Sequence, residues 1–163
     1  MYQGKQLMDW VMEGLEASGQ RYIIANEPYA EFNVAVYPDI LPSAGALSGL
    51  HSALYHAQND WVAVAACDMP FLPQGYWDLL CSRAETGNHQ IVAGVGPSGF
   101  PEPLAAIYHR SLLPVVARKI QDRQLRLQDV LTEARALQVP WQELKVKFGP
   151  NLFLNINTLQ DLP

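Results

Sequence analysis

The sequence has 163 residues, 49% of them hydrophobic and 17% charged, which excludes a disordered chain and fits a single domain over residues 1–163. The net charge of −5 argues against a nucleic-acid surface, although it leaves a nucleotide ligand possible. No apolar run approaches the ~20 residues of a membrane helix. Two cysteines without Cys-x-x-Cys spacing fit a cytoplasmic protein.

Helical and extended patterns alternate along the chain, which predicts an α/β fold. We expect helices over residues 5–18, 46–58, 74–85, 112–121 and 127–136, and a helical turn over 158–162. Strands are expected over residues 21–25, 34–37, 61–66, 90–95, 104–109, 139–142 and 152–155, with loops over 96–103 and 145–149.

Residues 61–73 are the most informative stretch. Residues 61–66 are all apolar, which is typical of a strand covered on both faces in a parallel sheet. Pro70 and Pro73 lack a backbone N–H, so the strand should end near Asp68. Ligands bind at the carboxyl edge of open α/β sheets, and Asp68 is therefore a candidate site residue. Alternatively, Asp68 caps the following helix.

A second candidate is the start of the helix at residues 46–58. Gly45, Ala46, Ser48 and Gly49 are small, which lets a ligand approach the backbone closely. A helix start of this kind also presents free N–H groups to an anion. The alternative is a tightly packed helix start without a ligand.

Further polar residues follow other strands. Asp39 comes after residues 34–37, Glu102 lies in the Gly/Pro loop, and Asn155 and Asn157 follow the last strand. Carboxylate and amide oxygens without a Cys or His cluster suit Mg²⁺. Glu102 could equally face solvent, and the two asparagines could be turn formers. The four histidines lack metal-ligand spacing and are expected on helix or strand surfaces.

Several blocks resemble, in order, those of the molybdenum cofactor guanylyltransferases and their cytidylyltransferase relatives. Asp39 followed by residues 45–50 is similar to the family's Asp and Gly-Pro-Leu-Ala-Gly block, and residues 66–72 are similar to its Cys-Asp-x-Pro-Phe block. Residues 102–108 resemble its Pro-Leu-x-Ala-x-Tyr strand, and residues 153–162 resemble its closing Phe-x-Asn-Ile-Asn-Thr-Pro-Glu-Asp-Leu. Residues 2–7 resemble the segment after its glycine-rich signature.

The resemblance implies a three-layer Rossmann-like nucleotidyltransferase fold with a mostly parallel sheet and helices on both faces. It implies transfer of a nucleoside monophosphate from GTP to molybdopterin, with release of pyrophosphate and Asp68 as the catalytic Mg²⁺ ligand. Asp39, Gly45, Ala46, Leu47 and Gly49 would bind the nucleotide. Glu102, Asn155 and Asn157 would face the pterin or the metal. Molybdoenzyme-maturation proteins are possible partners, whereas nucleic acid and membrane are not expected.

The sequence departs from this family at the front. Ala46 and Leu159 stand where the family has Pro, which is minor. The family opens with a strand and a loop, Leu-x-Gly-Gly-x-Ser-x-Arg-Met-Gly followed by Lys, which wraps the triphosphate. This sequence has no such block. We therefore expect the family's first central strand to be missing from between residues 21–25 and 61–66.

Three expectations follow from the missing block. The chain is truncated at its N-terminus, or the two strands pair directly, or another chain fills the gap, since buried unpaired backbone groups are costly. Two rival functions also stay open. One is transfer from CTP to the same cofactor, and the other is a non-catalytic binding module that has lost the phosphate loop.

Overall fold

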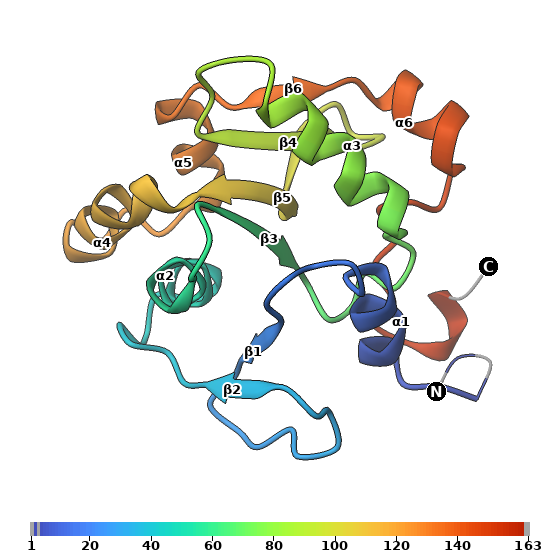
Figure 1. Cartoon of the computed structure of the whole chain (residues 1–163), viewed down its shortest axis with the longest axis horizontal. Coiled ribbons are helices and arrows are strands. Elements are labelled where there is room, and N and C mark those ends of the chain that lie inside the picture. The colour runs from blue at the N-terminus through green and yellow to red at the C-terminus, as the bar shows by residue number, and fades with distance from the viewer. Residues whose placement is uncertain (1, 3, 162–163) are drawn as a thin grey trace.

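The computed structural model describes residue 2 and residues 4–161; Gln3 and Leu162, which belong to two of the family-like blocks, lie outside the described residues. The described residues form six strands and six α-helices, which are interspersed along the chain (Figure 1). The strands are β1 (Tyr22–Ile24), β2 (Ala35–Tyr37), β3 (Trp61–Ala65), β4 (Ile91–Val95), β5 (Pro101–His109) and β6 (Leu137–Val139). The helices are α1 (Leu7–Gly14), α2 (Ala46–His56), α3 (Gln74–Ala84), α4 (Leu113–Gln121), α5 (Leu127–Glu133) and α6 (Trp141–Phe148), with 3₁₀ turns η1 (Arg110–Leu112) and η2 (Leu159–Asp161).

The larger sheet has the strand order β3-β5-β4-β6. Strand β5 runs antiparallel to β3 and β4, whereas β6 runs parallel to β4. Three of these four strands therefore point the same way and only β5 is reversed. The predicted α/β class is confirmed, with one reversed strand in a sheet that is otherwise parallel in direction.

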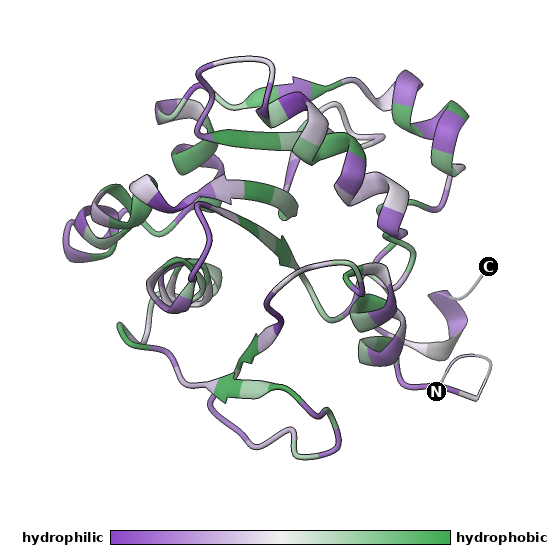
Figure 2. Ribbon diagram, in the orientation of Figure 1, coloured by the Kyte–Doolittle hydropathy of each residue, from purple (hydrophilic) through white to green (hydrophobic). Residues whose placement is uncertain are grey.

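Helices cover both faces of this sheet, as the alternation of its side chains requires. On one face Ala93 and Ala106 pack with residues of α2, α4 and α5. On the other face Val92 and Ile107 pack with residues of α3 and α6. The strands are accordingly apolar along both faces, and they are coloured mostly green in Figure 2. The hydroxyl of Tyr76 on α3 donates to the carbonyl of Ala105, which ties that helix to β5.

Strands β1 and β2 form a separate parallel sheet. Among the described strands neither of them pairs with β3, so the expectation of direct pairing between the two segments is wrong. Helix α2 packs against both β1 and β3. The hydroxyl of Tyr22 on β1 also donates to the carbonyl of Ala53 on α2. We infer that α2 fixes the two strands on opposite sides of a cleft.

The C-terminal third differs most from the sequence prediction. The expected strand at 139–142 and loop at 145–149 are wrong, because the strand ends at Val139 and α6 occupies residues 141–148. Helix α6 begins after Pro140 and ends at Gly149, whose φ is 89°. Residues 152–155 form no strand, since the N–H of Leu154 donates to the carbonyl of Asn151 within a turn.

One further boundary differs from the prediction. The expected loop over residues 96–103 ends earlier, because β5 already begins at Pro101, where a missing N–H is tolerated at the first position of a strand. Glu102 therefore lies in a strand and not in the loop.

Among the described helices, none is long and apolar enough to cross a membrane.

Candidate active site

The loop after β3 places Asp68 at the carboxyl end of that strand. The N–H of Ala66 donates to the carbonyl of Leu104 at 3.0 Å, and the N–H of Met69 donates back to the carbonyl of Ala66 at 3.3 Å, so the chain turns at Asp68. Met69 is buried and anchors the turn, whereas Asp68 stays partly exposed. The alternative role as a helix cap is wrong, because α3 is preceded by Pro73 without a side-chain cap.

The C-terminal segment packs beside this turn. The N–H of Ile156 donates to the main-chain carbonyl of Asp68 at 2.8 Å. Ile156 is buried, while Asn155 and Asn157 on either side of it are exposed. One backbone bond therefore brings two of the predicted asparagines next to Asp68, although they are far from it in sequence.

Asp161 fixes the same segment, and sequence reasoning missed it as a site residue. Its carboxylate accepts hydrogen bonds from the N–H of Thr158 at 2.7 Å, the hydroxyl of Thr158 at 3.1 Å and the N–H of Asn157 at 3.0 Å. These hydrogen bonds lower the pKa of Asp161, and the bond donated by the Thr158 N–H has the largest effect. The signal was present as Thr-x-x-Asp, the spacing of a capping box.

Glu102 lies near the start of β5, at the edge of the sheet where β3 and β4 end. Strand β5 pairs Ala105 with Ala65 and Pro101 with Val95, so Glu102 enters at the carboxyl ends of both neighbours. Its Oε1 packs against Gly96, where an added Cβ would lie 2.1 Å away. Burial raises the pKa of Glu102, and none of the ion pairs among the described residues involves it.

Asp39 follows β2 and is held by a residue that follows β1. The side chain of Asn26 donates to Oδ2 of Asp39 at 3.1 Å, and its Oδ1 accepts from the N–H of Asp39 at 3.0 Å. This reciprocal pair links the two loops at one end of the small sheet. The sequence did not mark Asn26 as a site residue, because a partner from another loop gives no local signal.

Two serine hydroxyl groups of α2 bind the loop that precedes this helix. The hydroxyl oxygens of Ser48 and Ser52 accept from the N–H groups of Ala44 and Ile40, at 3.0 and 2.9 Å. Gly45 precedes the helix with a φ of 57°. Leu47 is fully buried in the core, so only its backbone could contact a ligand.

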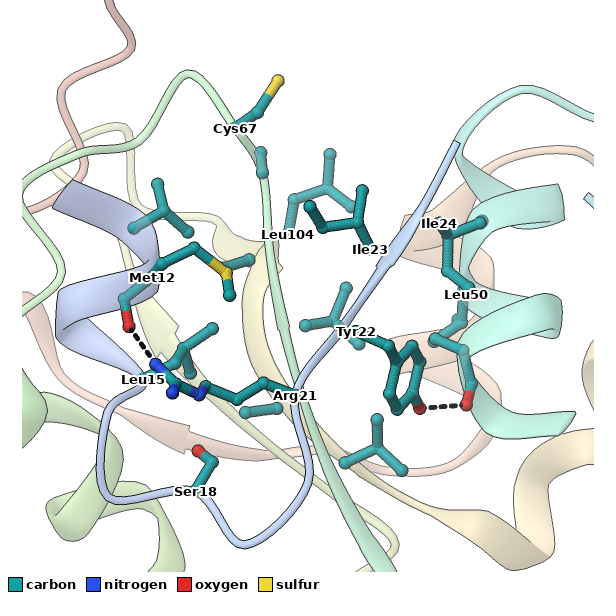
Figure 3. A pocket seen from close by; sticks show the side chains of 18 of the residues that line it. Met12, Leu15, Ser18, Arg21, Tyr22, Ile23, Ile24, Leu50, Cys67 and Leu104 are labelled. Atoms are coloured by element: carbon teal, nitrogen blue, oxygen red, sulfur yellow. Dashed lines mark hydrogen bonds between the residues drawn. The ribbon is translucent and has the colours of Figure 1, made fainter. Parts of the chain in front are cut away.

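A cleft of about 620 Å³ opens between β1 and β3 (Figure 3). It brings Ala46 and Gly49 of α2 together with Cys67 and Asp68. The other predicted site residues lie outside its lining; they are Asp39, Gly45, Leu47, Glu102, Asn155 and Asn157. The structure thus gathers one part of the predicted site in the cleft and places Asn155 and Asn157 beside Asp68.

The remaining reactive groups do not form a catalytic cluster. Burial, and then the charge of Asp68, raise the pKa of the Cys67 thiol, which disfavours a thiolate nucleophile. The expectation of surface histidines is wrong for His51, which is only 6% exposed and whose pKa burial lowers. In the part of the chain that the structure describes, no three His, Cys, Asp or Glu side chains gather as a metal site.

The fold, with loops gathered round a carboxylate at the carboxyl ends of β3 and β4, is that of the nucleotidyltransferases. The structure of molybdopterin-guanine dinucleotide biosynthesis protein A from Archaeoglobus fulgidus superimposes with a TM-score of 0.81 at 25% identity, over 99% of this chain and 84% of that one. A 2-C-methyl-D-erythritol 4-phosphate cytidylyltransferase from Thermus thermophilus shares the fold, with a TM-score of 0.67 at 15% identity, over 97% of this chain and 86% of that one.

The family profile of the MobA-like NTP transferase domain matches residues 1–138, and the chain belongs to this family of nucleotidyltransferases. A probable molybdenum cofactor guanylyltransferase of Deinococcus radiodurans is 34% identical over 165 residues, covering 99% of this chain and 81% of the relative. A similarly named protein of Clostridium perfringens is 31% identical, covering 98% of this chain and 82% of the relative.

Proposed function

We propose that this chain transfers the nucleoside monophosphate of GTP to molybdopterin, with release of pyrophosphate, and that Mg²⁺ bound at Asp68 assists the reaction. The observation that carries the proposal is the position of Asp68, a partly exposed carboxylate at the mouth of a cleft that also contains the first turns of α2. The named relatives supply the substrate class, since they carry the name of probable molybdenum cofactor guanylyltransferases.

The donor set at Asp68 fits a magnesium ion held mostly by its substrate. Mg²⁺ commonly binds through one or two carboxylates, with the other positions filled by phosphate oxygens and water. Asp68 offers one carboxylate, and Asn155 and Asn157 beside it offer amide oxygens, which are hard ligands of the same kind. When bound, the ion neutralises negative charge on the phosphate oxygens.

The chain's own residues would then position the two substrates. The small residues Ala46 and Gly49 let the triphosphate approach the backbone at the start of α2, where the helix dipole favours an anion. Asp39, held by Asn26, would hold the nucleoside part from the end of the small sheet. Glu102, Asn155 and Asn157 would face the pterin or the metal. Catalysis by positioning needs no side-chain nucleophile.

The direct test is a transfer assay on this chain. Purified chain is incubated with molybdopterin, Mg²⁺ and either GTP or CTP, and both pyrophosphate and the dinucleotide product are measured. We expect product from GTP that disappears when EDTA removes the metal. Product from CTP but not from GTP would overturn the base assignment. Absence of product with either nucleotide would overturn the proposed function.

A further inference from the structure

The turn that joins β4 to β5 holds an exposed aromatic ring in a fixed position. Phe100 precedes β5 and is 67% exposed. Its carbonyl accepts from the N–H of Gly96 at 2.8 Å, and the N–H of Gly99 donates to the carbonyl of Gly96 at 3.0 Å, so backbone hydrogen bonds close the turn. A single exposed apolar side chain is common on protein surfaces, and Phe100 becomes significant through the residue beside it.

That residue is Glu102, which lies on the same face of the hairpin as Phe100. Pro101, between the two, pairs with Val95 of β4, and alternate residues of a strand project to one face. Two residues of a strand span about 7 Å, so the two side chains are neighbours on this face. The side chain of Gln128 on α5 donates to the carbonyl of Pro101 at 2.8 Å, which holds the start of β5 in place.

The carboxylate of Glu102 has acceptor capacity that the fold does not use. The side chain is half-buried, and its Oε1 lies against the backbone of Gly96, where an added Cβ would come within 2.1 Å of it. In the part of the chain that the structure describes, no donor forms a hydrogen bond or an ion pair with this carboxylate. A partly buried carboxylate without donors is costly, and a ligand that supplies N–H groups would offset that cost.

The backbone next to this carboxylate carries no side chains on the same face. Gly94 and Gly96 are alternate residues at the end of β4. A Cβ at Gly94 would lie 2.6 Å from the ring of Phe153, so that ring covers Gly94, whereas the three atoms nearest to a Cβ at Gly96 all belong to Glu102. The hairpin therefore presents an exposed ring, a free carboxylate and a bare stretch of backbone next to each other.

We propose that Phe100 and Glu102 form a subsite for a 2-amino-4-oxopyrimidine ring, which stacks on Phe100 while its N–H edge donates to the carboxylate of Glu102. Such a ring has an amino group and a ring N–H side by side, and the two oxygens of a carboxylate accept two parallel N–H bonds. Aromatic side chains stack on flat heterocycles of many kinds. This proposal rests on the proposed function, and it assigns Glu102 to a ring of the substrates and not to the metal.

The surroundings of Glu102 favour the ring over the metal, and the pterin over the base. Among the described residues, no three His, Cys, Asp or Glu side chains gather as a metal site, so this carboxylate has no such companions. Pterin and guanine both carry the 2-amino-4-oxopyrimidine edge. The nucleotide is assigned to the cleft beside α2, and neither Phe100 nor Glu102 lines that cleft. The subsite is therefore that of the pterin of the acceptor.

The test is the binding of free pterin to the full chain, without nucleotide and without Mg²⁺. Pterin is fluorescent, and the change in its fluorescence on addition of the chain reports binding, which we expect to be saturable. Lumazine has an oxygen in place of the 2-amino group and is the matched control ligand. It should displace pterin only at a concentration at least about tenfold higher, because its carbonyl would face the carboxylate. Guanosine should also need at least about tenfold more.

Two substitutions test the two side chains separately, with thermal unfolding measured on the same samples. Glu102→Gln should weaken pterin binding at least about tenfold and reduce the preference over lumazine, because an amide has one oxygen and its NH₂ donates to the lumazine carbonyl. Phe100→Ala should weaken the binding of both ligands at least about fivefold, whereas Phe100→Tyr should retain it. Tyr55→Ala is the matched control, since it removes another exposed ring, on α2, and should leave binding unchanged.

Three results would overturn this proposal. Absence of saturable pterin binding by the parent chain would rule out a ring subsite. Unchanged binding by a folded Glu102→Gln or Phe100→Ala protein would place the pterin elsewhere. Displacement by guanosine at an equal concentration would assign the subsite to the nucleotide base and not to the acceptor. These measurements omit GTP, Mg²⁺ and turnover, so a failure of this proposal is distinguishable from a failure of the transfer assay.

Discussion

Replacing Asp68 by Asn should remove magnesium-dependent transfer and leave the fold intact. Among the described residues, the carboxylate of Asp68 takes part in none of the hydrogen bonds or ion pairs, and its backbone carbonyl, which accepts from Ile156, is retained by Asn. The Asp68→Asn change therefore removes a negative charge from the mouth of the cleft without removing a structural contact.

We expect a small effect of Asp68→Asn on the free energy of unfolding and a large effect on the transfer rate. A partly exposed side chain without structural partners changes the free energy of unfolding by no more than about 0.5 kcal/mol. Loss of a ligand to a charge-stabilising ion removes several kcal/mol of transition-state stabilisation. Since each 1.36 kcal/mol is a factor of ten in rate, we expect transfer to slow by about 10²- to 10³-fold.

The assay is the initial rate of pyrophosphate release across a magnesium titration, with thermal unfolding measured on the same samples. Asp122→Asn is the matched control, because it makes the same charge change at an exposed residue after α4. We expect the control to keep the parent rate. A parent rate in the Asp68→Asn protein would refute the role of this carboxylate, and a large loss of stability would refute its structural independence.

Four other substitutions test the surroundings of the site. Burial raises the pKa of Glu102 above its ordinary 4.5, so the folded state holds this proton more tightly than the unfolded state does. Stability therefore falls as the pH rises from 4.5 through the raised pKa of the folded state. Glu102→Gln should raise the melting temperature at neutral pH but not at acid pH. The pKa of Asp161 is shifted in the opposite direction, so its carboxylate stabilises the fold above pH 3.8, and this stabilisation is lost as the pH falls through the lowered pKa. Asp161→Asn should speed hydrogen exchange at Asn157 and Thr158 at neutral pH. A Cβ at Gly94 would lie 2.6 Å from Phe153 and 2.8 Å from both Leu144 and Tyr76, so Gly94→Ala should cost about 1–3 kcal/mol in urea unfolding. Gly49→Ala, at a position with open space, should instead stabilise the chain by up to about 1 kcal/mol. A stabilising Gly94→Ala together with a destabilising Gly49→Ala would contradict the packing described at both glycines.

Strand β3 and the carboxylate that follows it could be predicted from the sequence because their signals are local. The run of apolar residues before Asp68 and the prolines after it determine where β3 ends, whatever the rest of the chain does. The start of α2 was predicted at the correct residue, Ala46, for the same reason. The family-like blocks also predicted the class of enzyme, which the comparisons confirm.

The C-terminal elements were misassigned because their local patterns are ambiguous. Residues 141–148 show a weak helical pattern, which becomes a helix because Leu144 is buried against α3 and β4 side chains. Leu152 and Phe153 suggested a strand, but both are buried in consecutive positions of a turn. Short apolar runs of this kind are decided by the core that receives them.

The sequence by itself determined the α/β class and the position of Asp68 at a strand end. Only the tertiary structure decided that Ile156 binds the carbonyl of Asp68, that Asn26 holds Asp39 and that β1 and β3 stand apart across a cleft. Strand ends and helix starts depend on residues a few positions apart, whereas these pairings join segments distant in the chain. Their partners are selected by packing and hydrogen bonding in three dimensions, which a local pattern does not specify.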